Sequence, residues 1–153
     1  MGKIIKFKDK YPSAISVFSK WAEKGKDEGM EKGHAKSVEF MFEKLEPFFK
    51  DTFSAIDVGC GNGWVVRKFK ELNSCILAVG VDGANQMIEK AKTKDSCNNY
   101  FCADINHWKP IQKFDIIHSM EVLYYLEQPL NFLNRVYSEW LNKKGQLILS
   151  LIH

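Results

Sequence analysis

Residues 55–63 read Ala55-Ile56-Asp57-Val58-Gly59-Cys60-Gly61-Asn62-Gly63, a short apolar run that passes directly into a loop with glycine at every second position. Such an apolar run is typical of a buried strand. Because glycine carries no side chain, the loop can turn sharply and its backbone can approach a ligand closely at the start of the next helix. The stretch therefore predicts a strand followed by a ligand-binding turn.

The chain beyond residue 54 alternates short apolar runs with amphipathic helical patterns. Strands are predicted at 55–58, 76–81, 100–103, 114–119 and 145–152, and helices at 64–72, 85–93 and 130–141. This alternation is typical of βαβ units, which build a parallel sheet with helices on both faces. We predict an α/β, Rossmann-like fold with the strand order 3-2-1-4-5.

Two helices are predicted ahead of the sheet, over residues 13–24 and 34–45, where apolar residues recur at three-and-four spacing. The glycine-spaced stretch Gly25 to Gly33 between them is interpreted as a mobile loop. We divide the single domain into an N-terminal helical cap, residues 1–50, and a ligand-binding core, residues 51–153.

Composition and charge narrow the class of protein. A chain of 153 residues can bury one sizeable core but has little room for a second domain. The net charge of +3 is too small, and its lysines are too dispersed, to favour a nucleic-acid partner. We find no apolar run of the length that a membrane span requires and no signal-peptide core, so a cytoplasmic location is expected.

The four cysteines and four histidines show no pairing or ligand spacing. We expect free thiols and assign no metal site. They are Cys60, Cys75, Cys97, Cys102, His34, His107, His118 and His153.

Two acids follow later strands. Asp82 comes after the apolar run that ends at Val81, about 20 residues beyond the glycine loop, where an acid can accept both hydroxyls of a ribose. Asp104 follows the next predicted strand, where it could accept a hydrogen bond from an adenine amine. A nicotinamide dinucleotide is disfavoured, because its loop requires glycine where this chain has Trp64, and the triphosphate-binding Gly-Lys-Ser/Thr pattern is absent.

These residues resemble the class I S-adenosylmethionine-dependent methyltransferases. Residues 56–63 look like the glycine-rich first motif of that family, and residues 79–88 look like its ribose-binding strand and helix. Residues 102–105 resemble its adenine-binding segment, and residues 114–123 its fourth strand. The four ordered matches span about half of the chain.

The resemblance implies S-adenosylmethionine as cofactor and a role for each matching residue. Asp57 and the backbone of Gly59 and Gly61 would hold the methionine part, and Asp82 the ribose. Asp104 and the Ile105 amide would meet the adenine, Met87 its ring, and Ser119 with Met120 the sulfonium side. The predicted cofactor residues are Asp57, Gly59, Cys60, Gly61, Asp82, Gly83, Met87, Asp104, Ile105, Ser119 and Met120.

Residues facing the acceptor are less well defined by the sequence. Glu121 is a weak candidate for a general base, because an acid after the fourth strand more commonly caps or supports the pocket. Trp21 is most simply interpreted as a core residue, and the alternative is a lid over the methionine end of the cofactor. His34 is expected in solvent, with substrate contact as the alternative, and one of Tyr124 and Tyr125 is expected in the core.

Methyl transfer to an oxygen, nitrogen or carbon nucleophile is the leading hypothesis, with a small molecule as the expected acceptor. After the fourth strand the chain reads Ser119-Met120-Glu121-Val122, and not the Asn/Asp-Pro-Pro-aromatic segment by which related enzymes hold a planar amine. This difference favours a small molecule or a modified tRNA base as the acceptor. A non-catalytic module that binds cofactor or a partner is the second hypothesis. An NAD-dependent oxidoreductase is the third and weakest.

The sheet of this family usually has seven strands, whereas the predicted strands of this chain end with the fifth. Strands 6 and 7 would then be missing, and the last strand would be an exposed apolar edge. Such an edge favours pairing with a second copy as a homodimer. We also expect the chain to be a truncated piece of a longer enzyme. Such a piece should still bind the cofactor but should transfer methyl groups poorly.

Overall fold

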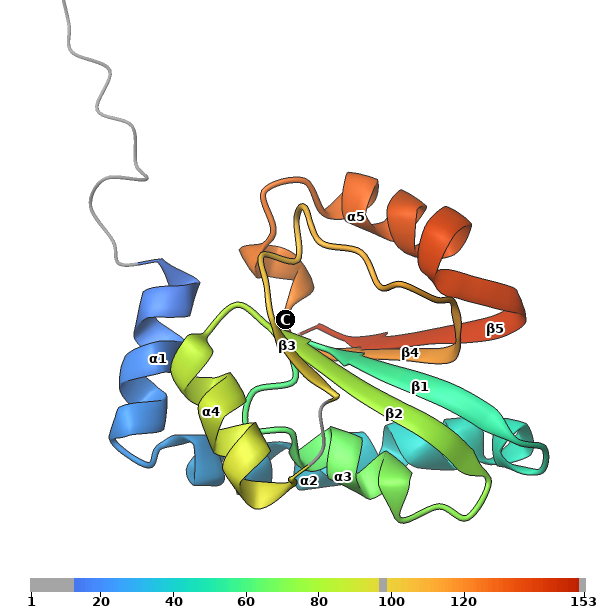
Figure 1. Cartoon of the computed structure of the whole chain (residues 1–153), viewed down its shortest axis with the longest axis horizontal. Helices are drawn as coiled ribbons and strands as arrows, with labels where there is room; N and C mark the ends of the chain where they lie inside the picture. The colour runs from blue at the N-terminus through green and yellow to red at the C-terminus, as the bar shows by residue number, and fades with distance from the viewer. Residues whose placement is uncertain (1–12, 97–98, 152–153) are drawn as a thin grey trace, which may run out of the picture.

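The computed structural model describes residues 13–96 and 99–151. Five parallel strands form one sheet in the order β3-β2-β1-β4-β5, as the sequence predicts (Figure 1). The strands are β1 (Phe53–Val58), β2 (Cys75–Asp82), β3 (Tyr100–Cys102), β4 (Phe114–Met120) and β5 (Leu141–Ser150). The α-helices are α1 (Ala14–Glu23), α2 (Asp27–Leu45), α3 (Trp64–Lys70), α4 (Asn85–Lys94) and α5 (Pro129–Arg135).

Shorter turns complete the chain. Two of them are 3-10 turns, and the third is a π-helical turn between α5 and β5. They are η2 (Glu46–Phe49), η3 (Leu123–Tyr125) and η4 (Val136–Trp140).

Two apolar clusters lie on opposite faces of the sheet, because successive side chains of a strand point in opposite directions. Ala55 belongs to the cluster that includes Phe42 and Phe69 of α2 and α3. Its neighbour Ile56 belongs to the other cluster, with Phe132 and Trp140 of α5 and η4. Helices therefore cover both faces (Figure 1), and every residue of β1 is buried. This explains why the strands read as continuous apolar runs.

The expected mobile loop over residues 25–33 is wrong. Gly25, with φ +68°, separates α1 from α2, but α2 then begins at Asp27 and continues through Gly29 and Gly33. Glycine weakens a helix interior by about 1 kcal/mol, which packing elsewhere in the helix can offset. The C-terminal half of α2 supplies that packing, because Val38, Met41, Phe42 and Leu45 are buried.

The last helix and strand also differ from the expected bounds. The helix expected over 130–141 is α5 followed by the π-helical turn η4, and β5 begins at Leu141, which pairs with Phe114 of β4. Ile152 and His153, included in the expected strand and histidine set, lie outside the described residues, as does Cys97. Cys60, Cys75 and Cys102 are free thiols, as expected.

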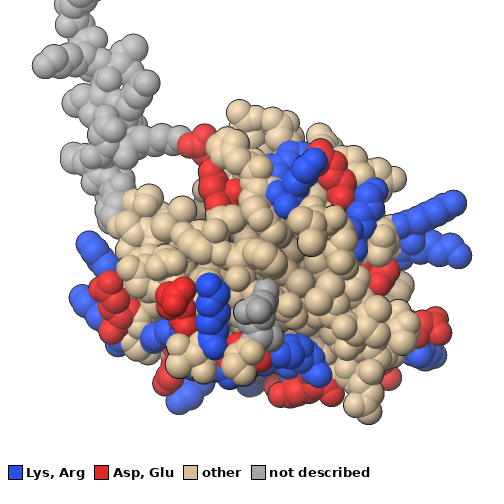
Figure 2. Space-filling view, viewed as in Figure 1, with Lys and Arg blue, Asp and Glu red and all other residues tan. Residues whose placement is uncertain are grey.

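Strand β5 lies at one edge of the sheet. Over residues 13–96 and 99–151 it pairs with β4 alone, so homodimer formation through this edge stays a prediction. In the same part of the chain, no helix is long and apolar enough to cross a membrane. Figure 2 shows basic and acidic side chains interspersed over the face it displays.

Candidate cofactor and acceptor site

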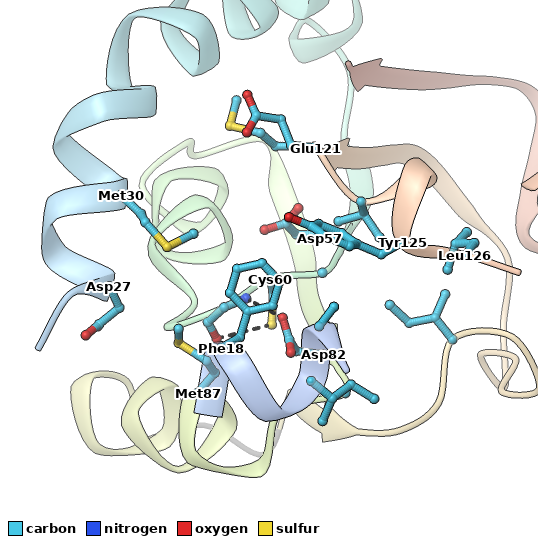
Figure 3. A pocket seen from close by; sticks show the side chains of 18 of the residues that line it. Phe18, Asp27, Met30, Asp57, Cys60, Asp82, Met87, Glu121, Tyr125 and Leu126 are labelled. Carbon is cyan, nitrogen blue, oxygen red and sulfur yellow. Dashed lines mark hydrogen bonds between the residues drawn. The ribbon is translucent and has the colours of Figure 1, made fainter. Parts of the chain in front are cut away.

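A cavity of about 700 Å³ lies at the carboxyl ends of the strands, beneath α1 and α2 (Figure 3). All but one of the predicted cofactor residues line it. The exception is Ser119, which is buried and donates its hydroxyl hydrogen to the carbonyl oxygen of Val58 at 3.0 Å. The lining members are Asp57, Gly59, Cys60, Gly61, Asp82, Gly83, Met87, Asp104, Ile105 and Met120.

The three glycines of the loop after β1 all have positive φ, at 76°, 52° and 79° for Gly59, Gly61 and Gly63. A Cβ atom on Gly59 would lie 2.2 Å from Cγ2 of Val122, and one on Gly63 would lie 2.6 Å from the ring of Tyr100. A Cβ atom on Gly61 would meet no atom within 4 Å. Gly59 and Gly63 are therefore needed for packing, whereas Gly61 leaves space on the cavity side.

Asp82 closes the glycine loop from the end of β2. One carboxylate oxygen accepts the amide hydrogen of Gly61 at 2.9 Å, and the other accepts that of Ala84 at 2.8 Å. Burial raises the pKa of Asp82, and the charge of Asp57 adds to this effect, against the opposing hydrogen bonds from the two amides. The carboxylate keeps lone pairs for a ligand, because each oxygen can accept more than one hydrogen bond.

Asp57 pairs with a histidine that the sequence analysis did not connect to it. Nδ1 of His118 lies 2.7 Å from a carboxylate oxygen of Asp57, and both residues are buried. They occupy matching positions of the neighbouring strands β1 and β4. The pair satisfies a carboxylate that would otherwise be costly to bury. Asp57 and His118 both stand near the carboxyl ends of their predicted strands, and this shared position is the sequence signal that could have indicated the pair.

Asp104 is held by its own turn at the cavity rim. It accepts hydrogen bonds from the backbone and side-chain amides of Asn106, and Nδ1 of His107 lies 2.6 Å from its other oxygen. These contacts, led by that of His107, hold the pKa of Asp104 below its ordinary value. Arg135 donates to the carbonyl oxygens of Asn106 and Trp108 and so fixes the turn from α5.

Asp27 is a cavity residue that the sequence analysis missed, because its segment was interpreted as a mobile loop. This buried carboxylate accepts hydrogen bonds from Nδ2 of Asn62 at 2.9 Å and from Nζ of Lys90 at 2.6 Å. Burial raises its pKa, but the two hydrogen bonds and the charge of Lys90 together hold the pKa below 3.8. Asp27 thus joins the start of α2 to the glycine loop and to α4.

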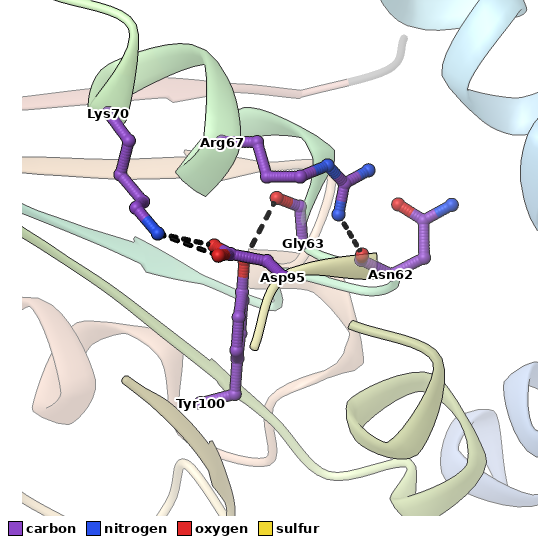
Figure 4. A network of polar contacts seen from close by, with 6 residues as sticks. All are labelled: Asn62, Gly63, Arg67, Lys70, Asp95 and Tyr100. Carbon is purple, nitrogen blue, oxygen red and sulfur yellow. Dashed lines mark hydrogen bonds and ion pairs between the residues drawn. The ribbon is translucent and has the colours of Figure 1, made fainter. Parts of the chain in front are cut away.

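A second polar network supports the glycine loop from the side away from α2 (Figure 4). The hydroxyl of Tyr100 lies 3.0 Å from the Asp95 carboxylate and 3.5 Å from the carbonyl oxygen of Gly63. Lys70 pairs with Asp95 at 2.7 Å. The loop is therefore fixed at its far end by residues of α3, β3 and the α4–β3 connection.

Aromatic side chains of α1 reach over the cavity. Phe18 packs edge-on against Trp21 and against Tyr125, with ring centroids 5.5 Å apart in both pairs. Both α1 residues line the cavity, and with Met87 they pack in a small apolar cluster that joins α1 to α4. The lid position considered for Trp21 therefore exists, and Phe18 shares it.

His34 and Glu121 meet at the cavity wall. Nδ1 of His34, on α2, lies 3.5 Å from a carboxylate oxygen of Glu121, at the end of β4. Their side chains are 27% and 21% exposed, so the expectation of a solvent-exposed His34 is wrong. Glu121 has φ +54°, a strained angle for a residue with a side chain. Tyr124 and Tyr125 also line the cavity and both are half exposed, so neither is in the core.

A family model described as a methyltransferase domain matches residues 11–153. The chain belongs to this methyltransferase family. Membership confirms the family resemblance of the chain, and the roles of single residues stay predictions. It also agrees with the observed strand order, which brings these segments to one edge of the sheet.

Two curated relatives of the chain are named for different methyl acceptors or reactions. It is 31% identical over 113 residues to malonyl-[acyl-carrier protein] O-methyltransferase 1 of Ilyobacter polytropus, covering 69% of this chain and 41% of that protein. It is 29% identical over 103 residues to the tRNA U34 carboxymethyltransferase of Glaesserella parasuis serovar 5, covering 63% and 32%. The chain thus spans less than half the length of either relative.

Solved structures share its fold. A Haloferax volcanii protein in complex with the Trm112 methyltransferase activator superposes with a TM-score of 0.78 at 22% identity, covering 88% of this chain and 59% of that one. The complex of DhpI with S-adenosylhomocysteine gives a TM-score of 0.71 at 17% identity, covering 88% and 65%. At these identities the likeness is one of fold.

Proposed function

We propose that the chain binds S-adenosylmethionine and transfers the methyl group to an oxygen, nitrogen or carbon nucleophile of an acceptor, leaving S-adenosylhomocysteine. The observation that carries the proposal is the hydrogen bond between Asp82 and the amide of Gly61, 2.9 Å long, at the wall of the cavity. This contact brings the two parts of the family's cofactor motif together. Family membership supports the reaction class.

The cavity suits such a cofactor. Its volume of about 700 Å³ falls in the range of small-molecule sites. Asp82 has acceptor capacity left for ribose hydroxyls, and Gly61 leaves its side of the cavity open to the methionine moiety. Asp104, Ile105 and Met87 also line the cavity, where they would meet the adenine.

When bound, the cofactor supplies an electrophilic methyl group on a sulfonium sulfur. The protein has to align an acceptor about 3 Å from that methyl group and keep water out. Phe18 and Trp21 of α1 line the cavity, where their rings would help to keep water from the methyl group. Glu121 and His34 lie where an acceptor that carries a proton could lose it.

A small molecule is the proposed acceptor. The small net charge of +3 does not favour nucleic acid, although several relatives are named for tRNA U34. The alternative function is that of a binding module, which holds the cofactor but transfers no methyl group, because a fold alone does not imply activity.

Calorimetry with S-adenosylmethionine, S-adenosylhomocysteine and NAD is the first test. We expect the first two to bind and NAD not to bind, and we expect Asp82→Ala to lose most of the affinity. Incubation with a labelled methyl donor, a metabolite panel and tRNA then separates enzyme from module. Binding of NAD alone would refute the proposal, and cofactor binding without transfer to any acceptor would favour the module.

A further inference from the structure

The cavity wall is acidic. Six carboxylates line it, and among the residues that the structure describes no lysine or arginine does so. One histidine, His34, is also present. The six are Asp27, Asp57, Asp82, Asp104, Glu121 and Glu127.

Four of these carboxylates are engaged by other groups of the protein, as described above: those of Asp27, Asp57, Asp82 and Asp104. Glu121 differs, because its one ion-pair partner among the described residues is the imidazole of His34 and not a lysine or an arginine. Glu121 therefore places a carboxylate on the described wall that no lysine or arginine pairs with.

Glu121 lies away from the proposed ribose site. In the view of Figure 3, Glu121 and Asp82 lie on opposite sides of Asp57. Aromatic rings line the cavity as well, among them that of Tyr124. Burial raises the pKa of the Tyr124 phenol, and Glu121 is near enough that its charge adds to this effect. A carboxylate beside an aromatic ring is the chemistry that recognises organic cations, by charge and by cation–π contact.

Resting on the methyl transfer proposed above, we propose that the acceptor is an amine, which binds as its ammonium ion to Glu121 and loses a proton to the Glu121–His34 pair. A carboxylate or phosphate acceptor would lose its hydration beside these acids, and no lysine or arginine lies on the described wall to pair with it. The same wall accepts an ammonium ion at low desolvation cost.

The proton and electron balance is simple. The ammonium nitrogen passes one proton to Nε2 of His34, and Glu121 stabilises the resulting imidazolium through Nδ1, 3.5 Å away. The freed nitrogen lone pair forms the new N–C bond as the C–S bond of the sulfonium breaks, and that electron pair stays on sulfur. The imidazolium then releases its proton to water, so one proton is produced per methyl group transferred.

Ligand-dependent thermal unfolding of the protein saturated with S-adenosylhomocysteine tests this without turnover. The probes share one skeleton and differ in charge: phenylpropylamine, phenylpropanol and phenylpropanoate. We expect the amine alone to raise the melting temperature further, and we expect Glu121→Gln to weaken amine binding at least ten-fold. Glu121→Asp, which keeps the charge, should retain part of the preference.

Controls separate this proposal from the preceding one. Glu39→Gln, an exposed site on α2, should behave as the parent protein. Failure of S-adenosylhomocysteine itself to stabilise the parent would refute the proposed cofactor. If it does stabilise the parent, an equal or larger effect of phenylpropanoate, no effect of the amine, or an amine preference that survives Glu121→Gln would overturn the amine proposal.

Labelled methyl transfer to amines supplies the second readout. We expect His34→Asn to lower kcat for an accepted amine more than it raises KM, because the imidazole takes the proton, and Glu121→Gln to affect both constants. Methyl transfer to the carboxylate probe in preference to the amine would contradict the proposal.

Discussion

The carboxylate of Asp82 bridges the amides of Gly61 and Ala84, and so joins the glycine loop after β1 to the start of α4. One side chain thus serves both the fold of the loop and the proposed ribose contact. Removal of the Asp82 side chain should weaken cofactor binding more than it destabilises the fold, because water can partly replace the carboxylate as acceptor for the two backbone amides.

Asp82→Ala should weaken S-adenosylhomocysteine binding by about 2 kcal/mol or more, because the ribose hydroxyls lose a charged acceptor in a partly dry site. In the parent protein, affinity for S-adenosylhomocysteine should also fall in acid, and the fall should begin at a higher pH than an ordinary aspartate would give. The ionised form is the one that accepts both hydroxyls, and burial raises the pKa of Asp82, so affinity falls as the pH falls through that raised value. Calorimetry across pH measures both effects, and unchanged affinity in Asp82→Ala would show that the ribose lies elsewhere.

Gly61→Val should abolish cofactor binding and leave most of the sheet intact. The valine side chain would occupy cavity space, and φ +52° is a disfavoured angle for a β-branched residue. Thermal unfolding with and without S-adenosylhomocysteine is the measurement. A valine variant that still gains stability from the ligand would contradict the close approach of ligand and loop.

Gly29→Ala and Gly33→Ala should each stabilise the protein by about 0.5–1 kcal/mol, since both sites are helical and a Cβ atom there would meet nothing within 4 Å. Gly25→Ala is the matched control, and its φ of +68° should make that change destabilising. Urea unfolding compares the three. Equal effects at all three sites would mean that α2 does not extend back to Asp27.

Asp27→Ala should cost about 1–3 kcal/mol, because Lys90 and Asn62 lose their buried acceptor. The pKa of Asp27 is lowered, so its contribution to stability is fully present above 3.8, the ordinary value, and is lost as the pH falls through the lower folded-state value. Urea unfolding across this acid range should show that loss in the parent but not in Asp27→Ala. A double-mutant cycle with Lys90→Met measures the pair directly.

Glu121→Gly should keep or raise stability, because glycine relieves a strained backbone angle worth about 1 kcal/mol. The same variant should lose the amine preference. Denaturant unfolding and the probe series together test this, and a clear loss of stability would mean that Glu121 is chiefly a structural residue.

The sheet was predictable because strands that are buried on both faces consist of continuous apolar residues. Asp82, the last residue of β2, and Asp104, which follows β3, stand at the ends of such apolar runs. Helix α2 was not predictable at Gly29 and Gly33, where local propensity opposes a helix that is stabilised by packing of its C-terminal half. That error also hid Asp27. The Asp57–His118 contact depends on the register of β1 and β4, which periodicity within one strand does not specify.

The attachment of α1 bears on how long a ligand stays bound. This ten-residue helix packs on α4 through Ala22, Ala84 and Met87, with Phe18 and Trp21 beside them. A cofactor bound beneath those two rings would leave only when α1 moves away from α4, which would expose the buried Ala22, Ala84 and Met87. We therefore expect release of the spent cofactor to depend on this movement.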